Sequence, residues 1–237
     1  MSLYNLNLYV HILAGTAALA SFWTAAALRK GSGRHRSVGS VFLISMLAVA
    51  ITGVGIGLAA LGRGQTVFGS FLMYLVLIVI TPCFLGWRAV RDKNDVKRYT
   101  GVAYHALAWG NLIAGGIMLV QGIRYEQLII AAVSGVGLAT GPLMLRFAWR
   151  PPTDRQWWLS RHFTFMLGAG LGAHVAFLNI GFSRMLPPEL GPIAQRLSWF
   201  VPFVAFLIAR WWLSRKYGPR PAAGTVTPTA HLGHGSA

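Results

Sequence analysis

Residues 37–62 decide the fold of this chain, and they read SVGSVFLISMLAVAITGVGIGLAALG. No charged side chain interrupts them. A helix rises about 1.5 Å per residue, so the stretch exceeds the roughly 20 residues that cross a hydrocarbon layer of about 30 Å. Backbone polar groups find no water in lipid, and a helix satisfies them internally. The stretch is therefore expected to be a membrane-spanning helix.

Composition extends this expectation to the whole chain of 237 residues, of which 55% are hydrophobic and 11% charged. A typical soluble domain has about 25% charged residues. We predict an all-α, polytopic membrane helix bundle with seven transmembrane helices in residues 1–216, followed by a polar, disordered cytoplasmic tail in residues 217–237. The expected spans are 5–28, 37–62, 67–88, 101–123, 125–146, 160–184 and 194–214.

The basic residues predict the orientation of the bundle. Of the 21 Lys and Arg residues, 17 fall on the side that holds the C-terminus and four on the other side. Cytoplasmic connections carry such an excess, so the N-terminus is expected outside and the C-terminus inside. Six tryptophans fall at the same cytoplasmic ends, where interfacial belts form: Trp87, Trp149, Trp157, Trp158, Trp211 and Trp212. The net charge of +16 then indicates contact with the lipid bilayer and its anionic cytoplasmic headgroups, and no nucleic-acid partner.

The acids exclude several classes of membrane protein. None of the five lies deep in an expected span, because Asp92, Asp95 and Asp154 fall in cytoplasmic connections and Glu126 and Glu189 fall at the external side. A proton pump with a carboxylate relay, or a membrane hydrolase with His and Asp ligands, needs an acid inside the bundle. A retinal protein needs a lysine within a span, and the four lysines are peripheral.

Histidine is the titratable residue that remains inside the spans. Counted from the helix ends, His11 and His174 lie at equal depth near the outer surface, which predicts an outer pair that binds haem b or another transition metal. His105 and His162 form a weaker inner candidate. The alternative is that each imidazole bonds a neighbouring backbone or hydroxyl group. His162 and His174 are twelve residues apart, about 120° around a helix, which disfavours two stacked haems.

Glycines are concentrated in three of the expected helices. Small residues let membrane helices approach closely, so we predict tight helix packing there. Room for a flat cofactor or a substrate path is the functional alternative. The glycines are Gly53, Gly55, Gly57, Gly137, Gly141, Gly168, Gly170 and Gly172.

Two motifs near the N-terminus carry a resemblance to a known family. Residues 11–19 read HILAGTAAL, and residues 29–39 read RKGSGRHRSVG. This arrangement resembles the bacterial predicted membrane proteins grouped as domain of unknown function 2306 (DUF2306), over approximately residues 8–212. The pair Arg161-His162 looks like a later basic-histidine element of that family. The resemblance implies a multi-pass protein of the bacterial cytoplasmic (inner) membrane, without an established activity.

The basic turn before residue 37 has two interpretations. Lys30, His35 and Arg36 fall at the level of the cytoplasmic headgroups, where they are suited to contact a phosphate or an anionic lipid. They are equally suited to be a structural clasp of the turn.

Three hypotheses of function remain open at this stage. The first is a membrane redox protein with a histidine-ligated haem or metal, exchanging electrons with a quinone at the cytoplasmic histidines. The second is a small-molecule or lipid carrier. The third is a non-catalytic membrane subunit or assembly factor. The sequence leaves open which of these holds and whether the chain is an enzyme.

Overall fold

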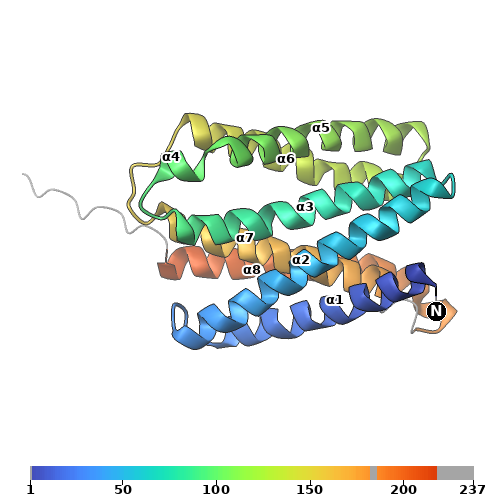
Figure 1. Ribbon diagram of the computed structural model, residues 1–237, viewed down its shortest axis with the longest axis horizontal. Coiled ribbons are helices and arrows are strands. Elements are labelled where there is room, and N and C mark those ends of the chain that lie inside the picture. Colours follow the sequence, from blue (N-terminus) through green and yellow to red (C-terminus); the bar gives the residue numbers. More distant parts are fainter. Residues whose placement is uncertain (1, 182–185, 218–237) are drawn as a thin grey trace, which may run out of the picture.

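The computed structural model describes residues 2–181 and 186–217, and every regular element in these ranges is a helix. Eight α-helices are connected by short turns (Figure 1). A π-helical turn, Phe177–Gly181, and a 3₁₀ turn, Pro188–Leu190, lie between the last two. The helices are α1 (Leu3–Ala27), α2 (Gly33–Gly62), α3 (Thr66–Arg91), α4 (Val96–Tyr99), α5 (Val102–Arg124), α6 (Leu128–Trp149), α7 (Trp157–Ala176) and α8 (Gly191–Tyr217).

Six of these helices are long and apolar enough to cross a membrane, namely α1, α2, α3, α5, α6 and α8. They coincide with six of the seven predicted spans. The counterpart of the predicted span 160–184 is α7, which is not among the six because its twenty residues include Arg161, His162 and His174. Residues 182–184 of that span lie outside the described residues.

The long helices run side by side and alternate in direction along the bundle (Figure 1). Helix α3 contacts α2, α5 and α7, and α7 contacts α1, α3 and α8. The α1–α2 turn, the α3–α5 connection, the α6–α7 connection and the C-terminal end of α8 lie at one end of the bundle, at the left of Figure 1. The connections in which the sequence concentrates its basic residues are therefore gathered at this one end.

Close helix packing at the predicted glycines is confirmed. A Cβ atom on Gly137 would lie 2.4 Å from the backbone oxygen of Asn111, and one on Gly141 would lie 2.8 Å from that of Ala108. Gly170 is covered by the ring of Phe22. These contacts bring α5 against α6 and α1 against α7 at distances that only glycine permits.

Several buried polar side chains are hydrogen-bonded inside the bundle, whereas the Tyr99 hydroxyl and Gln121 Oε1 are buried without a hydrogen-bond partner. The Asn111 amide donates to Thr81 Oγ1 at 2.9 Å, which joins α5 to α3. The Tyr74 hydroxyl accepts from the Gly137 N–H at 2.8 Å and donates to backbone oxygens of α6. Because an unpaired polar group is costly in a low-dielectric core, these bonds fix the register of α3 against α5 and α6.

The structure corrects several local expectations. Helix α2 begins at Gly33, before residue 37, because the Ser32 hydroxyl accepts from the His35 N–H and Gly31 supplies the positive φ of the turn. Trp157 is buried in the core instead of lying in an interfacial belt. Tyr217, assigned to the tail, is the last residue of α8, and the rest of the tail lies outside the described residues.

Candidate functional site

The outer histidine of α1, His11, faces α2. Its Nδ1 lies 2.8 Å from Thr52 Oγ1. The Thr52 hydroxyl has one proton, which it donates to the Ala48 carbonyl at 2.7 Å, so it accepts from the imidazole. His11 therefore carries its proton on Nδ1, and the backbone of Val49 is a further polar partner of the ring.

The outer histidine of α7, His174, has both ring nitrogens engaged. Its Nδ1 lies 2.7 Å from the Gly170 carbonyl, which only accepts, so Nδ1 is the donor. Its Nε2 accepts from the indole N–H of Trp23 at 2.8 Å. The rings of Phe22 and Trp23 meet it edge-on, with centroids 5.5 and 5.6 Å away. In this arrangement His174 has no lone pair left for a metal.

The structure does not bring the outer pair together. His174 lies beside Phe22 and Trp23, which follow His11 by eleven and twelve residues on α1, or about 16 and 18 Å along the helix axis. No contact joins the His11 and His174 rings in the described residues. Residue counting from helix ends gave the two rings equal depth, but it took no account of how α7 lies against the second half of α1.

The N-terminal ends of α2 and α7 hold a different arrangement of histidines. His162 donates its Nδ1 proton to the Gly86 carbonyl of α3 at 2.9 Å, and His35 donates its own to the Ala25 carbonyl of α1 at 3.0 Å. His162 is within electrostatic reach of His35 and Lys30. For both rings Nε2 makes no hydrogen bond to any described group. A neutral imidazole held in this way has a free lone pair on Nε2, and this is the usual state of a histidine that binds a metal.

The other inner candidate, His105, is held by its own helix. Its Nδ1 lies 3.3 Å from the Gly101 carbonyl, and its ring is edge-on to Tyr104 at 6.0 Å. No contact with His35 or His162 is found in the part of the chain that the structure describes. No described contact therefore joins His105 and His162, which were predicted as the inner candidate, and His35 and His162 are related by electrostatic reach alone.

The basic turn is a clasp for the end of α1. Lys30 Nζ donates to the Ala25 carbonyl at 3.0 Å and to that of Ala26, which are among the last carbonyls of α1. Burial, and then the nearby charge of Lys216, lower the pKa of Lys30. Arg36 is exposed, and its side chain contacts no described group. The geometry thus favours the structural interpretation for Lys30.

No group of three or more His, Cys, Asp or Glu side chains in residues 2–181 and 186–217 is placed to hold a metal ion. A metal centre in this part of the chain has at most two such protein donors. A haem iron, which takes two axial imidazoles, needs no more.

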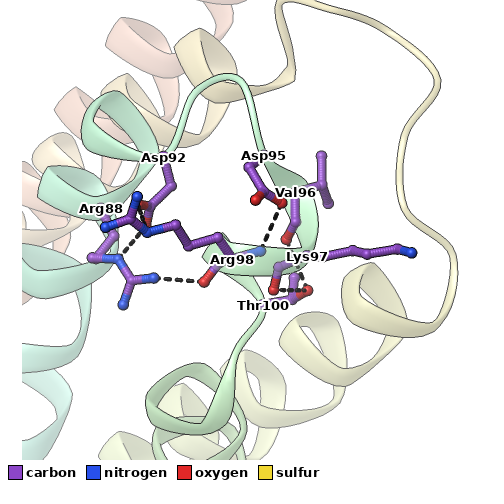
Figure 2. A network of polar contacts seen from close by, with 7 residues as sticks. All are labelled: Arg88, Asp92, Asp95, Val96, Lys97, Arg98 and Thr100. Carbon is purple, nitrogen blue, oxygen red and sulfur yellow. Dashed lines mark hydrogen bonds and ion pairs between the residues drawn. The ribbon is translucent and has the colours of Figure 1, made fainter.

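A cluster that sequence reasoning missed lies at the end of α3. Asp92 is buried, and both of its carboxylate oxygens face arginines (Figure 2). Arg88 Nε bonds Oδ2, and Arg98 Nε lies 3.3 Å from Oδ1. The i, i+4 spacing of Arg88 and Asp92 was a readable signal for the first pair. Arg98 reaches Asp92 only because α4, begun by the Asp95 cap, turns back toward α3.

Comparison with known proteins adds no assignment. No family model, no curated protein and no solved structure matches the chain. The resemblance to DUF2306 stays a prediction.

Proposed function

We propose that this protein spans the bacterial cytoplasmic membrane seven times, with its N-terminus outside and its C-terminus inside. Helix α7 has the length of a span, about 30 Å, and its neighbours α1, α3 and α8 cover part of its surface, so it needs fewer apolar side chains to face lipid. The positive-inside distribution of Lys and Arg supports the orientation.

Cysteine labelling tests this topology, because the chain has the single cysteine Cys83, which is buried. In a Cys83→Ala background, Ser2→Cys should react with a membrane-impermeant maleimide in intact cells. Ser214→Cys should react only after the membrane is opened. Labelling of both, or of neither, in intact cells would show an even number of crossings and contradict the seven-span topology.

We further propose that the protein is a membrane redox protein whose haem or transition-metal centre is held between His35 and His162. One observation carries this assignment: both Nδ1 protons are fixed by backbone carbonyls of other helices while both Nε2 atoms are open. The two rings come from α2 and α7 and lie within electrostatic reach of each other. The limit of two protein donors favours an axially ligated haem iron over a tetrahedral metal site.

The test is an absorption spectrum with metal analysis on the detergent-purified full chain. We expect a Soret band and bound iron, both lost in His35→Ala and in His162→Ala. His174→Ala is the matched control, because its ring has no open nitrogen, and it should keep the chromophore. His105→Ala should keep it as well.

Two results would overturn this assignment. A colourless, metal-free wild-type protein would remove the redox proposal. Loss of the chromophore in His11→Ala and His174→Ala, with retention in His35→Ala and His162→Ala, would move the centre to the outer pair. Size-exclusion chromatography and circular dichroism on each variant separate loss of cofactor from loss of fold.

A further inference from the structure

A pocket of about 230 Å³ opens beside the last two turns of α3. No histidine lines this pocket. Three guanidinium groups and one carboxylate give its lining a net charge of +2. Its lining residues are Phe84, Trp87, Arg88, Arg91, Asp92 and Arg98.

The buried carboxylate contacts two of these arginines. Asp92 bonds Arg88 and pairs with Arg98, and Arg88 also donates through a terminal nitrogen to the Arg98 carbonyl at 2.6 Å (Figure 2). These contacts tie the end of α3 to α4. Asp92 Oδ2 holds the Arg88 guanidinium by a hydrogen bond, whereas Oδ1 meets Arg98 only as an ion pair, so it is Arg88 that Asp92 orders before any ligand arrives.

Donors remain after these bonds are counted. A guanidinium has five N–H donors. Arg88 uses two of its N–H donors, in the bonds to Asp92 and to the Arg98 carbonyl. Arg91 makes no side-chain hydrogen bond within the described residues. Aromatic rings hold the planes of both groups, with the Arg88 guanidinium carbon 5.6 Å from the Phe84 centroid and that of Arg91 4.9 Å from the Trp87 centroid. The open N–H edges are thus ordered at little further entropic cost.

We propose that this pocket binds a phosphate group. Planar guanidinium forks match the tetrahedral oxygens of phosphate in a bidentate manner, and three of them line a single cavity here. The pocket lies at the end of the bundle that gathers the basic connections, the level of lipid headgroups in the proposed topology. The phosphate belongs either to an anionic phospholipid or to a soluble phosphate compound, and the chemistry of recognition is the same for both.

Native mass spectrometry of the full chain in mixed micelles tests the proposal. With phosphatidic acid and phosphatidylcholine present together, we expect adducts to favour phosphatidic acid. Arg91→Gln should weaken that binding at least about tenfold, because it removes a charge-assisted hydrogen bond to the phosphate. Arg91 lies outside the Asp92 network, so this variant leaves the α3–α4 contact intact. Arg155→Gln, at an exposed position at the same end, removes the same charge outside the pocket and should have no effect.

Inorganic phosphate distinguishes the two sources. Displacement of phosphatidic acid by millimolar phosphate, with the same sensitivity to Arg91→Gln, supports phosphate recognition and assigns a soluble ligand. Retention of the lipid assigns the headgroup. Equal weakening by Arg91→Gln and Arg155→Gln, or no preference of the wild type for phosphatidic acid, would overturn the pocket as a phosphate site.

Discussion

The two histidines of α7 are held in opposite ways. Near the C-terminal end of the helix, His174 is saturated by Gly170 and by the Trp23 indole. Near its N-terminal end, His162 is bonded through one nitrogen only, and arginines around a buried acid at the end of α3 keep open donors. A side chain whose donors and acceptors are all hydrogen-bonded within the protein supports the structure. A side chain with an unused donor or acceptor is available to a ligand. Four predictions test this comparison.

The largest expected contrast is in chemical reactivity. Diethylpyrocarbonate attacks an imidazole nitrogen that has a free lone pair. In metal-free protein we expect His162 and His35 to react about five times faster than His174, since attack on His174 requires loss of a hydrogen bond worth about 1 kcal/mol. Peptide mass spectrometry measures the rates. His105, which also has an open Nε2, serves as the internal control for accessibility, and equal rates at His162 and His174 would break the comparison.

The next largest effect is on stability at the end of α3. Asp92→Asn leaves Arg88 and Arg98 without their counter-charge, and we expect it to lower the free energy of unfolding by about 2 kcal/mol. The cost is below the usual 3–5 kcal/mol for a broken buried pair because the Arg98 side chain is 63% exposed. Denaturation in detergent measures it. Asp154→Asn, on the neighbouring connection, should change stability little.

A smaller effect is expected at the contact between α1 and α2. Thr52→Val removes the oxygen that accepts from His11 Nδ1 and keeps the shape of the side chain. The unpaired N–H should cost about 1–2 kcal/mol. Thr52→Ser retains the hydroxyl and is the control in the same denaturation experiment. Equal stability of the Val and Ser variants would show that His11 does not depend on this bond.

The smallest effect on stability is predicted for Trp23→Phe. Trp23 is 62% exposed, so loss of its indole N–H should cost about 1 kcal/mol or less. The same substitution frees His174 Nε2 and should raise its rate of reaction with diethylpyrocarbonate toward that of His162. An unchanged rate in this variant would mean that the hydrogen bond from Trp23 is not what keeps His174 Nε2 from reacting.

The bulk of the fold was predictable because it depends on local composition. Six predicted spans match helices that are long and apolar enough to cross a membrane, since uninterrupted apolar runs specify a helix in lipid. Helix α4 was not predicted, because its four residues are fixed by the Asp95 cap and by Tyr99 packing on Tyr104, Phe147 and Trp157. The site was predicted less well, because residue counting gives depth along one helix and not which face meets which neighbour.

The sequence by itself determined that the chain is a bundle of helices, six of them long and apolar enough to cross a membrane, and that its acids lie outside the long helices while several histidines lie within them. Only the tertiary structure decided which nitrogens are open. His174 was closed by Trp23, a residue 151 positions away, and Asp92 was enclosed by an arginine from the next element. The physical reason is that a donor or acceptor is hydrogen-bonded only if a partner lies next to it in space. Helix packing, and not the order of residues in the chain, decides which groups become neighbours.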